Sequence, residues 1–374
     1  MTLLAVRRAQ ELCEFCPKMC RFACPVSEAT SREALTPWGK VSLAALSGRS
    51  PDASAALAFA GCTGCHRCAV YCAHDNDVPS ILYAARATAV RAGVAPRAWT
   101  DLPARFSAQG HGETEDLAAV HATLRTGHGE ALLFPGCDAL AQGGEEARQA
   151  LFVAKELGAP LGLVPPGALC CGQKLVEGGH PELHAAHLGR VRALLARPRQ
   201  PVHLVFLQPG CARSVLESWG LPEGSRVEHL TSYLARALAA LPDRSRPPPL
   251  EESLVWHDPC ELARGLRELT APRALLAAAV KDFREPERSG VDTSCCGAGG
   301  LLQRTMPEVA AQLAAGRRAE LDAAASSAAA LPPAAAAPAP AAAVTSSPAC
   351  AAALGAAEVV SVLARWLAQG ASRG

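Results

Sequence analysis

The hydrophobic positions of this chain follow one pattern in its first hundred residues and another in the rest. In residues 1–100 the apolar side chains recur at the spacing of an α-helix. Thr36-Pro37 begins one such run and Gly48 ends it, which predicts a helix between them. Residues 78–91 predict a second helix with one apolar face. The first part of the chain is therefore expected to be helical and rich in loops.

From residue 131 onward, short apolar runs alternate with helical ones. The short runs end at Pro, Gly or Asp and predict buried strands. In the first half, strands are predicted at 131–134, 161–164 and 202–207, and helices at 145–157, 181–195 and 228–241. In the second half, a strand at 254–257, a helical stretch, a helix from Pro307 and a strand near Val344 repeat the order. Residues 93–129 are interpreted as a polar connecting arm and residues 244–249 as a stiff linker.

This succession predicts an α+β chain with three domains. Residues 1–100 would form an α-helical module, and residues 130–243 and 251–370 two tandem α/β domains. Residues 323–343 are a low-complexity Ala/Pro tract, interpreted as an insertion before the last strand. A length of 374 residues suffices for two or three cores.

Charge and hydropathy restrict the expected binding partners and cellular location of the protein. The formal net charge is +1 and 19% of residues are charged, which leaves no large basic field for nucleic acid. We find no signal-peptide core and no apolar run long enough to span a membrane. We therefore expect a cytoplasmic protein, and peripheral association with the inner face of the membrane, through a partner, stays open. Its sixteen cysteines are expected to be reduced.

Eight of these cysteines form two dense groups in the first hundred residues. One has the spacing C-x2-C-x3-C-x3-C followed by Pro25, and the other has C-x2-C-x2-C-x3-C. Three closely spaced thiols wrap one corner of an iron–sulfur cubane, while the fourth is carried away to a second cluster. We therefore predict two [4Fe-4S] clusters with crossed ligands: Cys13, Cys16, Cys20 and Cys72 for one, and Cys62, Cys65, Cys68 and Cys24 for the other.

Other uses of such cysteines fit the spacing less well. Structural zinc usually takes two C-x2-C pairs separated by a dozen or more residues, and it remains the main alternative. Structural disulfides belong to small secreted domains. A radical-SAM loop needs C-x3-C-x2-C, which is the reverse of the order from Cys13 to Cys20.

The other eight cysteines repeat in register in the two later halves. Each half has one Cys after its first strand, a Cys-Cys-Gly triplet and one Cys after its last strand: Cys137, Cys170, Cys171 and Cys211, then Cys260, Cys295, Cys296 and Cys350. Ligands gather at the carboxyl ends of strands in open α/β sheets, so each set is expected to share one site. The alternative is buried hydrophobic cysteine. One or two further iron–sulfur clusters, or zinc, would occupy these sites.

No other catalytic arrangement stands out in the sequence. No G-x-G-x-x-G fingerprint follows a strand, so no flavin or nicotinamide site is expected, and we assign no catalytic residue. The nearest candidate is His257 beside Asp258, which we interpret as a strand-end pair that hydrogen-bonds the cluster loop.

Taken together, these motifs resemble iron–sulfur subunits that join a two-cluster ferredoxin module to two cysteine-rich CCG domains. This family includes the iron–sulfur subunit of glycolate oxidase, the anaerobic glycerol-3-phosphate dehydrogenase C subunit and the heterodisulfide reductase D subunit. The resemblance covers nearly the whole chain. Its specific marks are Cys24-Pro25, Thr-Pro-Trp-Gly-Lys at 36–40, the cysteines of 62–68, both CCG triplets and His-Asp-Pro-Cys at 257–260.

The resemblance implies a non-catalytic redox subunit of an oxidoreductase complex. Electrons would come from a flavoprotein dehydrogenase that oxidises a 2-hydroxy acid of the glycolate or lactate type, or glycerol-3-phosphate, and would leave to quinone or another acceptor. The alternative is a heterodisulfide-reductase-like subunit that reduces a disulfide at a CCG-domain cluster. In that version each CCG domain ends in C-x2-C and has five thiols. We pair Cys211 with Ser214 and Ser347 with Cys350, which leaves four thiols per copy, as in the glycolate oxidase version.

Overall fold

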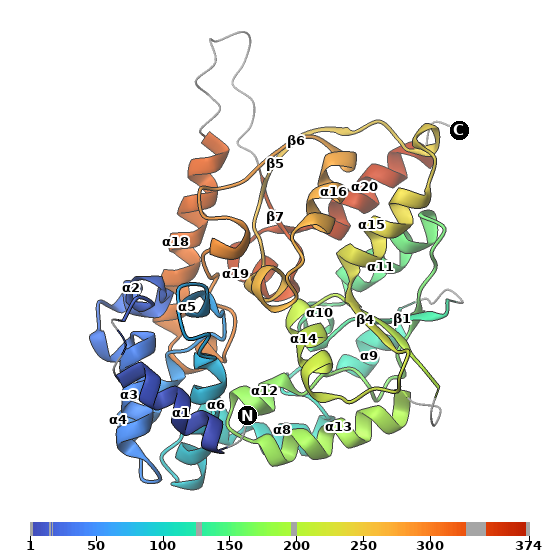
Figure 1. Cartoon of the computed structure of the whole chain (residues 1–374). Helices are drawn as coiled ribbons and strands as arrows, with labels where there is room; N and C mark the ends of the chain where they lie inside the picture. Colours follow the sequence, from blue (N-terminus) through green and yellow to red (C-terminus); the bar gives the residue numbers. More distant parts are fainter. Residues whose placement is uncertain are drawn as a thin grey trace. The chain divides into compact units, whose positions relative to one another are not determined.

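A computed structural model of the chain describes residues 3–14, 16, 18–124, 129–195, 200–326 and 342–371 (Figure 1). By its internal packing the chain divides into two compact units, and neither is continuous in sequence. Unit 1 consists of residues 1–112, 172–187 and 294–316. Unit 2 consists of residues 113–171, 188–293 and 317–374. The sequential boundaries proposed from the sequence remain predictions.

The regular elements of unit 1 are helices, joined by loops, in the part that the structure describes. Its elements are α1 (Leu3–Glu14), η1 (Arg21–Ala23), α2 (Pro25–Thr30), η2 (Glu33–Leu35), α3 (Pro37–Ser47), α4 (Ala53–Ala60), α5 (Arg67–Val70), α6 (Val78–Arg91), α7 (Arg97–Thr100), α8 (Leu102–Gln109), α12 (Gln173–Glu177) and α17 (Leu302–Thr305). The two helices predicted from the sequence are confirmed as α3 and α6. The Thr36 hydroxyl caps α3 by accepting from Gly39 N at 3.0 Å, and Gly48 follows its last residue with φ +51°.

Residues 93–124 of the predicted connecting arm contain helices. They include α7 and α8, and in unit 2 α9 (Leu117–Ala122). Trp99 and Leu102 are fully buried, and Phe106 is nearly so. The prediction weighed the polar, Gly- and His-rich composition of the segment and overlooked these widely spaced apolar anchors.

The described residues of unit 2 form two four-stranded parallel sheets. The strands are β1 (Ala131–Phe134), β2 (Gly162–Leu163), β3 (His203–Phe206) and β4 (Arg226–His229) in the first, and β5 (Leu250–Trp256), β6 (Val280–Arg284), β7 (Ala342–Thr345) and β8 (Ala357–Glu358) in the second. The first sheet has the order β2-β1-β3-β4 and the second β6-β5-β7-β8. Every pairing is parallel. The predicted repeat of α/β units is therefore present in the fold.

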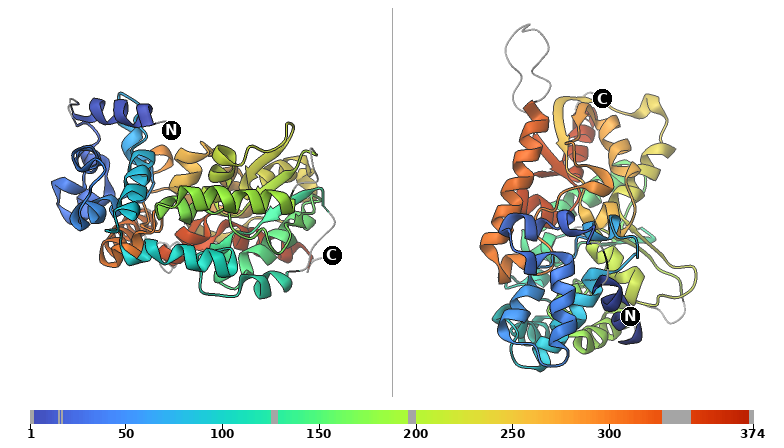
Figure 2. Two further views of the ribbon diagram at one scale, coloured as in Figure 1. Left: turned by 90° about the horizontal axis from the view of Figure 1, so that it is seen from below. Right: turned by 60° about the vertical axis from the view of Figure 1, so that its left-hand side comes forward.

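The helices of unit 2 bring the two sheets together as a pair. They are α10 (Cys137–Ala141), α11 (Glu145–Glu156), α14 (Pro209–Ser218), α15 (Leu230–Ala240), η3 (Asp243–Ser245), η4, a π-helical turn (Glu261–Gly265), α16 (Thr270–Ala279), η5 (Gly290–Asp292), α19 (Pro348–Leu354) and α20 (Val359–Ala371). Helices α13 (Pro181–Leu195) and α18 (Pro307–Ser326) contribute residues to both units. Helix α11 packs on α20 and α15 on α16 (Figures 1 and 2). Each contact joins the helix after the first strand of one copy to the helix after the last strand of the other, as in a pseudo-two-fold pair.

Strands β4, β6 and β8 lie at sheet edges and were missed, and the first two of them carry polar side chains. The helix predicted from residue 228 begins instead at Leu230, after β4. In β4, Glu228 binds Arg236 on α15 and His203 on β3. In β6, Asp282 accepts a hydrogen bond from Ser253 of β5 at 2.8 Å. Edge strands are commonly polar in this way, so they lack the hydrophobic signal of central strands.

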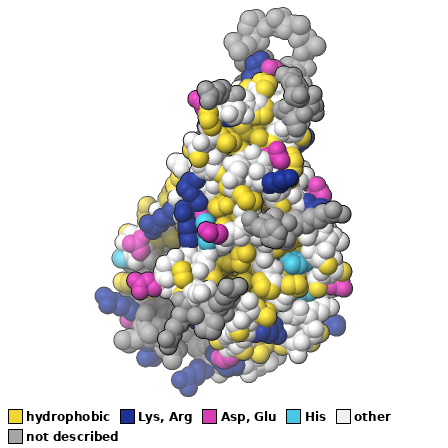
Figure 3. Space-filling model, turned by 90° about the vertical axis from the view of Figure 1, so that its right-hand side faces the viewer, with side chains coloured by type: hydrophobic (Ala, Val, Ile, Leu, Met, Phe, Trp, Pro, Cys, Tyr) yellow, Lys and Arg dark blue, Asp and Glu magenta, His cyan; other side chains and the backbone are white. Residues whose placement is uncertain are grey.

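Residues 327–341 of the predicted Ala/Pro insertion lie outside the described residues. Helix α18 ends at Ser326 and β7 begins at Ala342, on either side of them. The predicted linker is tied down at Arg246, which donates to the carbonyls of Leu238 and Leu241. Within the described ranges, none of the helices is both long and apolar enough to cross a membrane. On the face drawn in Figure 3, basic and acidic side chains of the described residues are interspersed.

Candidate metal centres

Four thiols of unit 1 border one cavity and define the Cys13 group: Cys13, Cys16, Cys20 and Cys72. The amide of Asn76 donates to Cys13 Sγ at 3.2 Å. Burial, reinforced by the neighbouring thiols, raises the pKa of Cys20 to about 11. Cys72 thus lies with the upstream cysteines, although it follows Cys68 by only four residues in the sequence.

Four other thiols border a second cavity and define the Cys62 group: Cys24, Cys62, Cys65 and Cys68. Cys68 also borders the first cavity. Burial raises the pKa of Cys68 well above its usual value, and the thiols of Cys65, Cys62 and Cys24 add to the shift. The structure therefore brings together the two sets that the crossed prediction paired, while ligation by them remains a prediction.

The loops around the Cys62 group are shaped by local geometry. Gly64 has φ +71°, and a Cβ there would meet the Tyr83 hydroxyl at 2.4 Å, so the turn between Cys62 and Cys65 requires glycine. Cys24 is the residue before α2, whose first residue is Pro25. Lys40 on α3 donates from Nζ to Gly61 O at 2.6 Å and to Cys24 Sγ at 3.5 Å.

Arg86 on α6 ties the loop of the Cys62 group to the rest of unit 1. Its guanidinium is fully buried, and within the described ranges it donates to backbone carbonyls alone. The acceptors are Phe59 O, Ala60 O, Cys62 O, Glu177 O and Gly300 O. The first two are carbonyls at the end of α4 and the fourth lies at the end of α12, where helices leave acceptors unsatisfied. Arg86 was not predicted as a functional residue, and its one signal in the sequence is a charged side chain on the apolar side of a predicted helix.

The second Cys-Cys-Gly loop packs against the same cluster loop within unit 1. Cys295 Sγ lies 3.5 Å from Thr63 Oγ1. A Cβ at Gly300 would be 2.1 Å from Cys62 O, and one at Gly299 would be 2.4 Å from Thr63 O. Both glycines are therefore required by a close approach of two backbones.

In the first CCG copy, the structure gathers all four predicted thiols in unit 2. Cys170 Sγ lies 3.8 Å from Cys137 Sγ, and Cys171 Sγ lies 3.1 Å from Cys211 Sγ. Cys137 begins α10 after β1, and Cys211 lies in the first turn of α14 after β3. The hydrogen bond with Cys171, together with burial, raises the pKa of Cys211 well above its usual value. We call this set the first CCG site.

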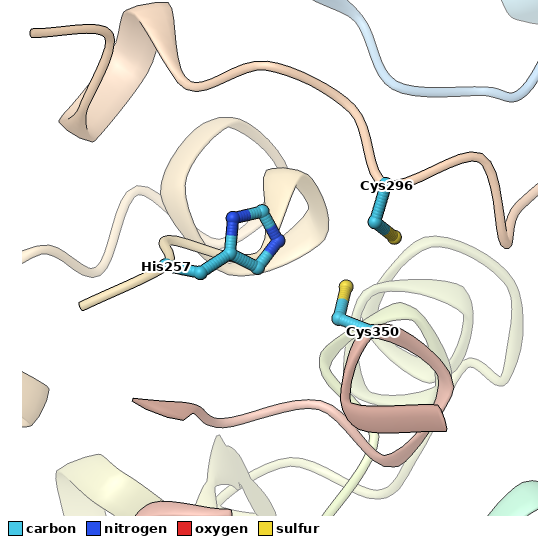
Figure 4. Close-up of side chains that lie close together, drawn as sticks. All are labelled: His257, Cys296 and Cys350. Atoms are coloured by element: carbon cyan, nitrogen blue, oxygen red, sulfur yellow. The ribbon is translucent and has the colours of Figure 1, made fainter. Parts of the chain in front are cut away.

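In the second copy, Cys260 and Cys350 belong to unit 2, whereas Cys295 and Cys296 belong to unit 1. Cys350 lies in the first turn of α19, and its Sγ is within 4.8 Å of a ring nitrogen of His257, which follows β5 (Figure 4). Cys260 immediately precedes the π-helical turn η4. The grouping of these four thiols in one second CCG site remains a prediction.

His257 is held in one protonation state by its surroundings. Arg317 Nε donates to His257 Nδ1 at 2.9 Å. Burial, with the charges of Arg317 and Arg264, lowers the pKa of His257 well below its usual value. The ring is therefore neutral with its proton on Nε2, and Nε2 has no hydrogen-bond partner among the described residues. Asp258 pairs with Arg273 and accepts from Gly290 N at 2.7 Å, which fixes the loop before Cys260.

In the sequence analysis, Cys211 and Ser214 of the first copy are the counterparts of Ser347 and Cys350 of the second. This correspondence is wrong. Counted from the strand ends, Gln208 corresponds to Ser347, because each is the N-cap before a proline that begins its helix. Cys211 then corresponds to Cys350, two residues after its proline. Ser347 Oγ donates to Gln208 Oε1 at 2.9 Å, so the two equivalent positions contact each other. Both copies lack a thiol at the same position.

The donor sets fit a thiophilic metal or cluster. In the Cys13 and Cys62 groups and in the first CCG site, the candidate donors are four thiols. Burial raises the pKa of Cys20 and Cys68, a hydrogen bond with Cys171 raises that of Cys211, and the crowding of the thiols adds to each shift. Metal coordination relieves such crowding because it takes up thiolates, and iron–sulfur clusters and zinc prefer this donor.

Comparison with known proteins supports this chemistry. Residues 131–215 and 254–355, together half of the chain, match the family model of the cysteine-rich CCG domain. The chain is similar to the D subunit of the dihydromethanophenazine:CoB--CoM heterodisulfide reductase of Methanosarcina barkeri, with 28% identity over 69% of this chain and 66% of that protein. It is 26% identical to the B subunit of the fumarate reductase (CoM/CoB) of Methanothermobacter marburgensis over 67% of this chain and 50% of that protein.

A shorter match involves a 49-residue stretch that is 45% identical to a probable membrane-anchored ferredoxin of Chromohalobacter salexigens, over 13% of this chain and 7% of that protein. The chain thus spans just under two thirds of the first relative and half of the second. Both matched copies contain the repeated strand order and the Cys-Cys-Gly triplet. The chain therefore belongs to the family of proteins built on the cysteine-rich CCG domain, of which it contains two copies.

Proposed function

We propose that the chain is an iron–sulfur electron-transfer subunit. Electrons pass from a flavin-linked dehydrogenase partner through the chain toward quinone or another acceptor. The observation that carries this proposal is the placement of Cys24 and Cys72, each of which borders the cavity of the other cysteine motif. That exchange is the ligand pattern of a two-cluster ferredoxin and is not needed for two independent zinc sites.

The residues would act by holding and insulating the clusters. The Cys13 and Cys62 groups would each hold a [4Fe-4S] cluster, which supplies one-electron redox chemistry when bound. The first and second CCG sites would hold one or two further clusters. Lys40 and Arg86 fix the backbone around the Cys62 group, and the buried side chains of α6 keep water from it. No residue of the chain needs to move a proton or form a covalent bond with substrate.

The contact between Thr63 and Cys295 supports a route from the Cys62 group to the second Cys-Cys-Gly loop within unit 1. A short path through packed protein favours electron transfer, and the two loops approach each other at glycines without side chains. Two of the relatives are named as subunits of reductases, which favours a partner subunit for this chain as well. By its resemblance, that partner oxidises a 2-hydroxy acid or glycerol-3-phosphate.

A disulfide-reducing function at a CCG site is the second candidate, and the name of the first relative favours it. The disulfide-reducing version has five thiols in each CCG domain. Here the fifth thiol would require a cysteine immediately before Pro209 in the first copy and immediately before Pro348 in the second. Gln208 and Ser347 occupy those positions and bind each other. Four-thiol sites favour electron transfer over disulfide chemistry.

The test is metal and redox analysis of the full chain purified without oxygen. We expect iron and acid-labile sulfide for at least two [4Fe-4S] clusters, no flavin, and no turnover of lactate or glycolate by the chain alone. Rapid reduction by a reduced flavoprotein should follow. Zinc without sulfide, or turnover of a 2-hydroxy acid by the isolated chain, would overturn the proposal.

A further inference from the structure

The two thiol groups of unit 1 differ in the charge that lies against them. Lys40 is 2% exposed and its ammonium contacts a cysteine of the Cys62 group, at 3.5 Å from Cys24 Sγ. Lysine is almost never fully buried unless it is paired. Its second contact is the neutral carbonyl of Gly61 at 2.6 Å. Lys40 therefore brings one positive charge to the edge of the Cys62 group.

This charge is not neutralised by an acidic side chain. Within the described ranges, Lys40 forms hydrogen bonds only with Cys24 and Gly61, and no carboxylate lies within salt-bridge distance of it. Other buried cations in this part of unit 1 are Arg86, whose guanidinium is bound to carbonyl oxygens, among them Cys62 O, and Arg67, which immediately precedes Cys68.

The Cys13 group has no buried ammonium of this kind among the described residues. Its closest polar side chain is the neutral amide of Asn76, which donates to Cys13 Sγ at 3.2 Å. Lys18 borders the same cavity, but its Nζ lies 3.7 Å above the Trp38 ring, and the residue is partly exposed. Solvent screens an exposed cation far more than a buried one.

We propose that Lys40 raises the reduction potential of the cluster in the Cys62 group above that of the cluster in the Cys13 group. The inference rests on the proposed function. Reduction adds one negative charge to a cluster, so a fixed positive charge nearby stabilises the reduced state. One electron leaves the cluster of the Cys13 group and enters that of the Cys62 group, and no bond or proton changes. Electrons would thus collect beside Thr63 and Cys295.

The experiment is a redox titration of the full chain under anaerobic conditions, followed by electron paramagnetic resonance. Cys65→Ser should remove or alter the signal that titrates at the higher potential, and Cys16→Ser should remove or alter the signal that titrates at the lower one. These two variants assign each signal to its thiol group. Lys40→Met should then lower the ratio of reduced to oxidised cluster in the Cys62 group at least tenfold at a fixed applied potential. For a one-electron couple this is about 59 mV. In the same variant, the ratio of reduced to oxidised cluster in the Cys13 group should change by less than about twofold.

Two further variants separate charge from structure. Lys40→Gln retains a donor for Gly61 O without the charge and should shift the potential as Lys40→Met does. Lys18→Met removes the partly exposed lysine beside the Cys13 group and should have a much smaller effect. If both Lys40 variants keep their clusters and their potentials, the inference fails while the proposed function stands.

The assignment variants can also refute the inference if the Lys40 variants do not fold. A higher potential at the Cys13 group would overturn the inference without any Lys40 variant. Absence of any cluster dependent on Cys65 would instead contradict the proposed function. Iron and sulfide content, measured on each variant, distinguishes these outcomes.

Discussion

Arg86 offers the sharpest test of how unit 1 is held together. Its guanidinium makes six hydrogen bonds to five backbone carbonyls, and all of these groups lie in unit 1. Replacement by methionine keeps the volume of the stem but removes every donor. The carbonyls at the ends of α4 and α12 then lose their capping partner, and so do Cys62 O and Gly300 O.

The size of the effect follows from the number of abandoned acceptors. A buried polar group left without its partner costs about 1–3 kcal/mol. At about 1 kcal/mol for each of the five carbonyls, Arg86→Met should lower the free energy of unfolding by about 5 kcal/mol. Domains are stable by only about 5–15 kcal/mol, so this is a large fraction of the total. For a unit of this size the melting temperature should fall by about 10–20 °C.

The assay is anaerobic urea unfolding followed by far-ultraviolet circular dichroism, with visible absorbance of the clusters as a second signal. Arg91→Met is the matched control, because Arg91 lies on the same helix and is exposed. It should change the unfolding free energy by less than about 0.5 kcal/mol. Equal midpoints for the two variants would refute the capping argument, since they would show that the carbonyls find other partners at no cost.

Three other substitutions test separate features. Gly300→Ala should destabilise the chain by more than Gly355→Ala and should perturb cluster absorbance: the glycines have φ of +66° and +64°, but a Cβ meets Cys62 O at 2.1 Å only at Gly300 and open space at Gly355. His257→Phe copies Phe134 of the first repeat and should cost about 1–3 kcal/mol in urea unfolding, because Arg317 Nε loses its acceptor; an unchanged midpoint would contradict that bond. Burial lowers the pKa of His229 to about 4. The contribution of His229 to the free energy of unfolding is therefore fully present above its unfolded pKa near 6.5 and is lost as pH falls toward 4. Between pH 7.5 and 5.5 the loss due to His229 is about 1.4 kcal/mol, and the unfolding free energy of His229→Gln should fall by that much less over the same range. An equal dependence on pH in both proteins would exclude His229 as its source.

Much of the fold could be predicted because its signals are local. Helix α6 was found at its observed ends, Val78 and Arg91, and strand β1 likewise at Ala131 and Phe134. Central strands are apolar on both faces and bounded by turn residues. Edge strands β4 and β6 carry charges that bind neighbouring strands and helices, so their stabilising contacts are visible only in three dimensions.

The candidate site shows the same division. The cysteines were found because their spacing is itself the chemical signal. Lys40 and Arg86 were not assigned roles, because a buried cation is identified by what surrounds it and not by its neighbours in sequence. The error at Ser214 arose from counting forward from Cys211. The common reference is the end of the strand, which places Gln208 and Ser347 at equivalent positions.

The contact between Gln208 and Ser347 also explains how the two CCG copies relate. In an isologous pair, equivalent residues meet at the axis, and these two N-cap residues are joined by a 2.9 Å hydrogen bond. The same symmetry places α10 against α19 and α14 against the π-helical turn η4, so the elements that begin beside the candidate ligand cysteines of one copy contact those of the other. The copies nevertheless differ beside the ligands, where the first has Phe134 and the second His257, whose Nε2 proton has no partner in the described part of the chain. A hydrogen-bond donor beside a thiol stabilises added negative charge, whereas a phenyl ring does not. The paired architecture thus brings equivalent elements of the two copies into contact, while the residue at the end of the first strand differs between them, Phe134 in one copy and His257 in the other.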